Sequence, residues 1–303
     1  MNLWKLLRDP RRILFVYGIR GGFRFLNDAA YVKLLYWCSI RKKLDLENPK
    51  TFNEKLQWLK LYDRKPEYTR MVDKYEAKRY VAEKIGEEYI IPTLGVWDRF
   101  EDIDFDSLPD QFVLKCTHDS GGLVIVKDKA KLDKKAAKKK IEKSLRRNYY
   151  YCGREWPYQN VKPRIIAEAF MVDESGTDLK DYKFFTFNGK AKMLFVATDR
   201  AVDTRFDFFD MDFRHLPILN GHENATKKIE KPKSFAQMKE LAETLSAGMP
   251  QIRVDFYDVN GQIYFGEMTF FHWSGFTPFE PEEWDLTLGN WIALPDMGAA
   301  EKP

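Results

Sequence analysis

The sequence predicts an α+β fold in which antiparallel hairpins alternate with amphipathic helices. Strand-like runs occur in neighbouring pairs, and two of these pairs are joined by Asn188-Gly189 and Asn260-Gly261, residues that are typical of two-residue hairpin turns. Helical patterns lie between the pairs, over about residues 133–147 and 234–246. A mixture in which hairpins dominate is typical of an α+β protein.

The composition is that of a folded soluble protein, because 44% of the 303 residues are hydrophobic and 32% are charged. That length is enough for one large or two to three small packed subdomains. The net charge of +4 argues against a dedicated nucleic-acid binder, whereas an anionic substrate is compatible with it. The three cysteines lack C-x-x-C spacing, which argues against a disulfide framework or a cysteine zinc site and favours a reducing cytoplasm.

The first 50 residues are basic and aromatic, and residues 13–17 form an apolar run between Arg12 and Arg20. No run approaches the roughly 18 apolar residues that span a bilayer, and we expect no secretory signal. Basic residues mixed with large apolar ones permit docking on an anionic membrane face or on a partner protein. A helix packed against the main body explains the pattern at least as well. We expect a cytoplasmic protein and leave open a peripheral contact with the inner face of the cell membrane.

Two helices are expected after this region. Thr51 and Glu54 have the spacing of a capping box, in which each side chain binds the backbone amide of the other, so a helix begins there. A second helix is expected over residues 69–85 and ends at Gly86. Strands are expected over residues 112–116, 123–126, 165–171, 182–187, 193–198, 206–213, 252–257 and 263–269.

The last hairpin carries the strongest chemical signal. A turn at Asn260-Gly261 roughly aligns Asp255 with Glu267 on the returning strand. Two carboxylates so close repel each other unless a cation lies between them, and Mg²⁺ accepts one or two carboxylates together with substrate phosphates. Spacing alone also allows a pair of surface acids matched to Arg253, so both interpretations stay open.

Lys115 lies on an otherwise apolar strand, where a lysine either reaches solvent or points at a fixed anion. The turn that follows contains Ser120-Gly121-Gly122, whose backbone amides are able to approach phosphates. A Gly-Gly hairpin tip is weak evidence by itself. On composition alone, Lys74 is an exposed lysine of a helix.

The order of these features is more specific than any one of them. Asp73-Lys74, residues 112–115 with the glycine turn, residues 166–171, Arg253-Val254-Asp255 and residues 266–269 follow each other along the chain. This series resembles the ATP-grasp superfamily. Residues 51–58, 181–184 and 265–270 resemble, more narrowly, its TupA-like branch, which is linked to teichuronopeptide and capsular polysaccharide synthesis. The resemblance covers about residues 48–295.

The resemblance implies an ATP-grasp fold in which two α+β subdomains clasp ATP, preceded by a basic helical N-terminal region. The implied units are residues 1–50, the N-terminal or central lobe at 51–110, a small lid subdomain at 111–175, and a C-terminal subdomain with the metal site at 176–303.

The resemblance also assigns roles. The implied catalytic residues are Arg253 and Lys183. ATP contacts fall to Lys74, Lys115, Ser120, Gly121, Gly122, Glu168, Ala169, Phe170, Met171 and Asp181. Mg²⁺ falls to Asp255, Glu267 and Thr269. Many superfamily members have Asn where Thr269 stands, so a second metal site is in doubt. For His118 and His272, hydrogen bonding competes with proton transfer or acceptor binding.

The implied reaction is ATP-dependent ligation of a carboxylate to an amine through an acyl phosphate. Polysaccharide synthesis suggests a uronic or sugar acid as acyl donor, with an amino acid or amino sugar as acceptor. One alternative is a glycosyltransferase, because three D-x-D sequences occur at residues 102–104, 104–106 and 210–212. Another is a nucleotide-binding scaffold that uses the N-terminal region as its contact.

Overall fold

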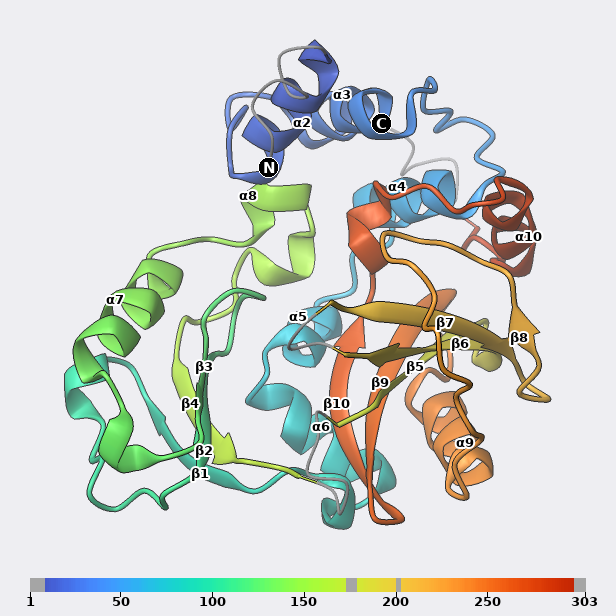
Figure 1. Ribbon diagram of the computed structural model, residues 1–303. Coiled ribbons are helices and arrows are strands. Elements are labelled where there is room, and N and C mark those ends of the chain that lie inside the picture. Colours follow the sequence, from blue (N-terminus) through green and yellow to red (C-terminus); the bar gives the residue numbers. More distant parts are fainter. Residues whose placement is uncertain (1–8, 173–178, 200–202, 297–303) are drawn as a thin grey trace.

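The computed structural model describes residues 9–172, 179–199 and 203–296. It contains a four-stranded and a six-stranded sheet, both antiparallel, which we call the small sheet and the large sheet. The two sheets stand apart with helices around each, and the N-terminal helices lie above them (Figure 1). This arrangement confirms the predicted α+β class. Residues 1–8 of the basic region lie outside the described residues.

The N-terminal region folds as helices α2 (Pro10–Ile19) and α3 (Asp28–Ile40). Helix α3 is packed into the body through a cluster that includes Leu35 and Phe276. Buried Arg154 ties the region down, because its guanidinium lies 4.6 Å from the Tyr31 ring and donates to the carbonyl oxygen of Leu26 at 2.9 Å. Packing is therefore confirmed for α3. None of the described helices has both the length and the apolar character that crossing a bilayer requires.

Helix α4 (Phe52–Tyr62) begins with the predicted capping box. The Glu54 amide donates to the Thr51 hydroxyl at 3.3 Å, and the Thr51 amide donates to the Glu54 carboxylate at 3.0 Å. Two further helices, α5 (Glu67–Val72) and α6 (Glu76–Ile85), stand where one helix was predicted over residues 69–85. The prediction of a continuous helix was therefore wrong.

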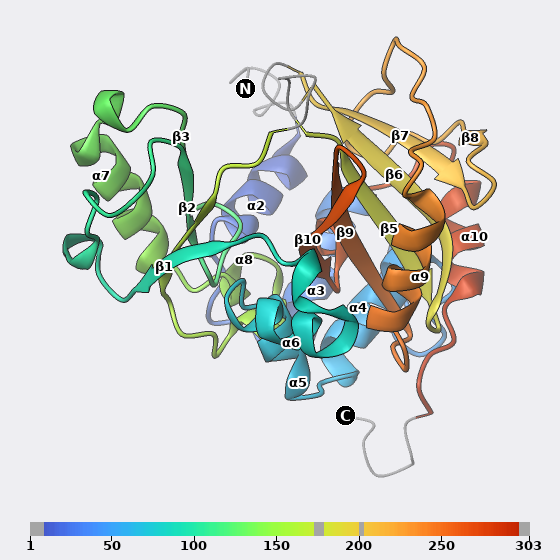
Figure 2. The ribbon, with the colours of Figure 1, turned by 90° about the horizontal axis from the view of Figure 1, so that it is seen from below.

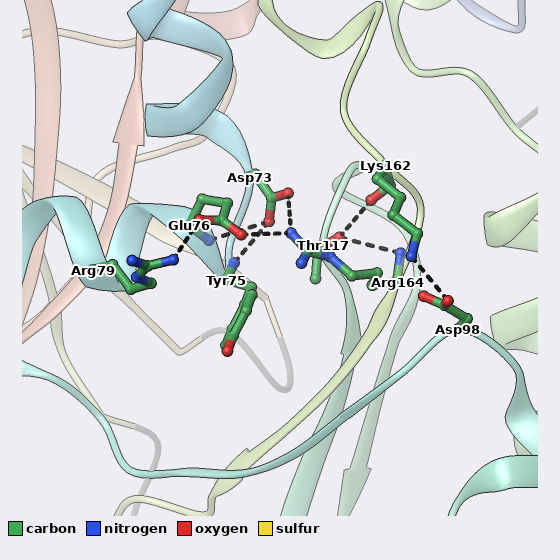
Figure 3. A network of polar contacts seen from close by, with 8 residues as sticks. All are labelled: Asp73, Tyr75, Glu76, Arg79, Asp98, Thr117, Lys162 and Arg164. Carbon is green, nitrogen blue, oxygen red and sulfur yellow. Dashed lines mark hydrogen bonds and ion pairs between the residues drawn. The ribbon is translucent and has the colours of Figure 1, made fainter.

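The break between these helices lies at Asp73, whose carboxylate accepts the backbone amides of Tyr75 at 2.9 Å and Glu76 at 3.4 Å and so caps α6. Arg164, which lies just before strand β4, donates to Asp73 at 2.8 Å and to Glu76 at 3.1 Å (Figure 3). The partner comes from more than 80 residues along the chain, so helical periodicity gives no sign of the break.

The small sheet has the strand order β1-β4-β2-β3. Its strands are β1 (Thr93–Trp97), β2 (Phe112–Cys116), β3 (Leu123–Val126) and β4 (Ile165–Ala169). Helix α7 (Lys134–Leu145) covers one face, where Leu114 belongs to the same apolar cluster as Ile141. Because side chains alternate along a strand, Lys115 points away from α7. The short helix α8 (Tyr150–Gly153) leads back toward β4.

The large sheet has the strand order β10-β9-β5-β6-β7-β8. Its strands are β5 (Asp181–Phe187), β6 (Lys190–Thr198), β7 (Arg205–Asp210), β8 (His215–Leu216), β9 (Gln251–Val259) and β10 (Gln262–Thr269). Helix α9 (Phe235–Leu245) covers one face, with Phe235 against Phe184 of β5 at 5.7 Å between ring centroids. On the other face, Phe52 of α4 lies 6.1 Å from Phe185. Helix α10 (Glu283–Trp291) packs beside α4. Figure 2 shows the two sheets from below, with α5 and α6 beside β10.

Candidate active site

The final hairpin has the predicted turn, with positive φ angles of 56° at Asn260 and 91° at Gly261. From this turn the strands pair evenly until Phe265, and a bulge at Gly266 then shifts the register by one residue. The shift places Glu267 directly opposite Asp255. Without the bulge, Glu267 would point to the other face of the sheet. The predicted alignment is thus confirmed, although it depends on a bulge that the turn alone does not predict.

Lys183, Asp255 and Glu267 lie side by side on three neighbouring strands, on the face opposite α9. Asp255 is 1% exposed and is held by two cations. Arg253 binds it in fork geometry, with nitrogen–oxygen distances of 2.7 and 2.8 Å, and the Lys183 ammonium contacts the same carboxylate. Lys183 also lies 2.5 Å from Asp181.

We call Asp181, Lys183, Arg253, Asp255 and Glu267 the large-sheet cluster, and it carries one negative charge in excess. Burial alone would raise the pKa of Asp255, but the charges of Arg253 and Lys183 outweigh it and lower that pKa. Burial would likewise lower the pKa of Lys183, yet Asp181 and Asp255 raise it. Asp255 and Lys183 therefore both stay charged near neutral pH.

The three predicted metal ligands are not equally open. The Glu267 side chain is 37% exposed, and its Oε2 lies 3.9 Å from Arg253. Asp255 is fully engaged, and the Thr269 hydroxyl accepts a hydrogen bond from Arg253 at 2.9 Å. Across the described ranges, no three His, Cys, Asp or Glu side chains converge as a metal cluster. Two carboxylates nevertheless fit Mg²⁺, which completes its octahedron with phosphate oxygens and water.

His272, which follows β10, orients Arg253. Its Nδ1 lies 2.8 Å from Nη1 of Arg253, and because a guanidinium only donates, Nδ1 is the acceptor. The ring proton therefore sits on Nε2, which donates to Asn220 at 2.8 Å. Burial, together with the charges of Arg253 and Lys183, holds the pKa of His272 well below 6.5. The hydrogen-bonding role is thus favoured over proton transfer.

A second cluster lies on the small sheet. Glu168 of β4 is 4% exposed, and its carboxylate lies 2.5 Å from the Lys115 ammonium and 2.6 Å from that of Lys78. Lys115 thus points at a fixed anion, as predicted for a lysine on an apolar strand, and the anion is a side chain of the protein. Lys78 of α6 was missed, although it lies four residues after Lys74 and five after Asp73.

We call Lys78, Lys115 and Glu168 the small-sheet cluster, and it carries one positive charge in excess. Burial alone would raise the pKa of Glu168, but the two lysines lower it. Burial would lower the pKa of Lys115, yet electrostatic interactions with Glu168, Tyr257 and Glu267 raise it. Tyr257 and Glu267 belong to the large sheet, so the two clusters are near enough for the charge of one to act on the other.

The turn between β2 and β3 is held by its own carboxylate. The amides of Gly121 and Gly122 donate to Asp119 at 3.2 and 3.1 Å, whereas Ser120 is exposed. Those amides are therefore occupied in this conformation. Lys74, which lies in the break between α5 and α6, donates to the backbone oxygen of Asp119 at 2.5 Å.

The buried ring of His118 adds to the rigidity of this turn. Its Nε2 lies 3.1 Å from the carbonyl oxygen of Ser144 and 3.0 Å from that of Arg147. These contacts favour a hydrogen-bonding role for His118.

The residues expected beside adenine lie at the end of β4. Ala169, Phe170 and Met171 are half-buried and follow Glu168 directly. The Ala169 amide donates to the carbonyl oxygen of Pro92 at 3.0 Å. The structure thus brings these residues to the small-sheet cluster.

The D-x-D sequences serve their own turns. Asp104 accepts the amide of Asp106 at 3.1 Å, and Asp210 accepts the amide of Asp212 at 2.9 Å. Asp102 is paired with Arg99 at 2.6 Å. These aspartates thus stabilise local turns and a local ion pair, and they lend the glycosyltransferase alternative no support.

The sequence matches the family model described as TupA-like ATPgrasp over residues 54–293. No curated protein matches it. The fold is similar to D-alanine–D-alanine ligase of Bacillus anthracis complexed with ATP, at 16% identity and a TM-score of 0.39, over 66% of this chain and 53% of that one. It is also similar to D-alanine–D-alanine ligase of Helicobacter pylori, at 16% identity and a TM-score of 0.39, over 81% of this chain and 70% of that one. A third similar structure is N5-carboxyaminoimidazole synthetase of Staphylococcus aureus, at 15% identity and a TM-score of 0.41, over 75% of this chain and 53% of that one. The match spans about half the length of the first of these, and at these values none carries an argument about activity.

Proposed function

We propose that this chain, which belongs to the TupA-like ATP-grasp family, is a carbon–nitrogen ligase that joins a sugar acid to an amine through an acyl phosphate. A carboxylate oxygen attacks the γ-phosphorus of ATP, and the bond to ADP breaks. The amine then attacks the acyl carbon, phosphate leaves with the bonding electron pair, and the nitrogen loses a proton to give the amide. No protein nucleophile is required, so the residues position the reactants and balance charge.

The observation that carries this proposal is the pair of opposed clusters of unlike charge. The positive excess of Lys78 and Lys115, with Lys74 nearby, suits phosphate oxygens. The negative excess of the large-sheet cluster suits a cation, and Asp255 with Glu267 would hold Mg²⁺. When bound, Mg²⁺ would neutralise charge on the phosphates.

The remaining residues take roles that their positions allow. Lys183 would contact a phosphate oxygen in place of Asp255, and Asp255, still held by Arg253, would have one cationic partner fewer when it holds the metal. Arg253, held by His272, stabilises negative charge on the acyl phosphate and the tetrahedral intermediate. We further propose that Asp181 binds ribose and that Glu168 to Met171 line adenine. Ser120 to Gly122 would close over the phosphates once Asp119 releases the glycine amides. Thr269 would be an auxiliary ligand of Mg²⁺.

We propose that the chain is divided into four units, at residues 1–50, 51–110, 111–175 and 176–303. Strand β1 lies in the second unit but completes the small sheet of the third. The choice of a sugar acid, and of an amino acid or amino sugar as acceptor, is supported by the resemblance to the polysaccharide branch.

We also propose that the N-terminal region touches the inner face of the cell membrane. Residues 1–50 contain eleven Lys and Arg against four Asp and Glu. On the same region Tyr17 is 56% and Phe25 is 83% exposed. Basic charge beside exposed aromatic rings suits an anionic lipid surface.

A screen for ADP release, with uronic acids crossed against amino acids and amino sugars, tests the proposed reaction. The expected result is release that needs both partners, needs Mg²⁺ and is lost in Asp255→Asn. Consumption of a UDP-sugar in place of ATP would support a glycosyltransferase. No turnover with any pair, while wild type and Asp255→Asn bind Mg-ATP equally, would contradict the ligase and leave the scaffold.

A further inference from the structure

The turn after β10 has an unusual backbone. Three successive residues of the turn η5 (His272–Gly275) are left-handed, with φ angles of 49° at Trp273, 53° at Ser274 and 62° at Gly275. Only glycine adopts this conformation without penalty, so two L-residues in a row are strained. Strain of this kind persists only where the surroundings fix it, and it often serves to place a side chain.

Several hydrogen bonds from buried polar side chains hold this turn in place. Gln57 of α4 donates to the carbonyl oxygens of Ser274 at 2.9 Å and Gly275 at 2.8 Å. The buried Lys60 ammonium donates to the same Ser274 oxygen at 2.8 Å. The Ser274 hydroxyl donates to Glu155, which is itself buried. The turn is therefore rigid, and its backbone atoms are not available to a ligand.

The side chain that the turn presents outward is Trp273, which is 43% exposed. Phe206 and His222 lie beside it, with ring centroids 6.2 and 5.9 Å away and ring planes inclined by about 30°. The backbone of Gly221 backs the indole, because a Cβ there would lie 3.2 Å from the ring. The indole is thus supported behind and beside, and part of its surface remains open.

This open indole lies next to the proposed reaction centre. The centroid of the Trp273 ring is 5.9 Å from that of His272, and His272 accepts from Arg253 at 2.8 Å. One imidazole therefore separates the indole from the guanidinium. A substrate whose carboxylate reaches Arg253 has its neighbouring atoms in reach of Trp273.

We propose that Trp273 is the stacking platform for the ring of the carboxylate substrate, a uronic acid whose pyranose ring lies on the indole. The inference rests on the proposed function and adds the residue that selects the substrate. A pyranose has a face of C–H groups and a rim of hydroxyls, which matches a flat apolar surface with a polar border. In a uronic acid the carboxyl carbon is bonded directly to the ring, which suits a site where Arg253 and Trp273 both contact His272.

The test is calorimetric binding of D-glucuronate to the Mg-ATP-analogue complex of the full chain. Trp273→Ala is expected to weaken glucuronate binding about tenfold, because the apolar contact between the indole and the sugar ring is lost. Trp273→Phe keeps an aromatic face, and its affinity should stay within about threefold of wild type. Trp37→Ala removes an equally exposed tryptophan (44%) from α3 and is the matched control, expected to bind as wild type. Equal melting temperatures show that the variants fold.

Two outcomes separate this inference from the proposed function. If carboxylate-dependent ADP release occurs and Trp273→Ala leaves glucuronate affinity and its KM unchanged, the platform is overturned and the ligase stands. If Trp273→Ala weakens glucuronate binding but no carboxylate gives ADP release, the platform stands and the ligase fails.

Discussion

The small-sheet and large-sheet clusters are built alike and charged oppositely. In each, a buried carboxylate is held between two cations: Glu168 between Lys78 and Lys115, and Asp255 between Arg253 and Lys183. The small-sheet cluster contains no further charged residue and therefore has a net positive charge. The large-sheet cluster adds Asp181 and the more open Glu267, which reverse the sign.

The difference between the clusters indicates what each side of the space attracts. Because a buried charge must be compensated, each central carboxylate first fixes the cations around it. The surplus charge is then left to act on a ligand. A surplus cation on one sheet and a surplus carboxylate on the other suit the two parts of Mg-ATP.

The largest expected effect comes from removing the central carboxylate of the small-sheet cluster. Glu168→Gln leaves the buried Lys78 and the half-buried Lys115 without a compensating charge, which should cost about 3–5 kcal/mol of unfolding free energy. Urea unfolding measures this loss. Glu101→Gln removes an acid whose ion pair with Lys138 is exposed, and it should change stability little. Equal stability of the two variants would show that the cluster is not held by charge.

A smaller effect is expected from changing the shape of a cation in the large-sheet cluster. Arg253→Lys keeps the charge but loses the fork on Asp255 and the bond to His272. We expect kcat to fall about 100-fold while the KM for ATP changes little. Steady-state ADP release measures both constants, with Arg146→Lys, at the exposed C-terminal end of α7, as control. A lysine variant with wild-type kcat would contradict the role of the fork.

The smallest effect concerns the pH dependence of stability. Burial and the charges of Arg253 and Lys183 lower the pKa of His272 in the folded protein, so below pH 6.5 the unfolded chain binds more protons than the native one. His272 therefore contributes stability that is complete above pH 6.5 and is lost as pH falls below it. In His272→Asn the slope of unfolding free energy against pH should decrease by up to about 1.4 kcal/mol per pH unit. Identical slopes between pH 5 and 6.5 would contradict this account.

Local sequence signals predicted the parts of the fold that depend on neighbouring residues. The capping box at Thr51 and Glu54 and the turns at Asn188-Gly189 and Asn260-Gly261 each need only adjacent residues, and all are present. The pairing of Asp255 with Glu267 was also found, although the bulge at Gly266 that produces it was not.

Features set by distant partners could not be read from the sequence. The helix breaks at Asp73 and Lys74, where Arg164 donates to the Asp73 carboxylate (Figure 3) and the carbonyl oxygen of Thr117 accepts the Lys74 amide. Lys78 looks like any surface lysine of a helix until Glu168 lies opposite it. The same holds for Asp119, which occupies the glycine amides that the family resemblance assigned to phosphates.

Calorimetric titration of ATP, with and without Mg²⁺, tests most directly whether the small-sheet cluster binds the phosphates and the large-sheet cluster binds Mg²⁺. The account predicts that Lys115→Met weakens ATP binding about tenfold or more in both conditions, because its charge acts on the phosphates. Glu267→Gln should weaken binding only when Mg²⁺ is present and should leave ATP alone unaffected or slightly tighter. If the two variants lost affinity equally in both conditions, the two clusters would not have separate roles, and the account would be wrong.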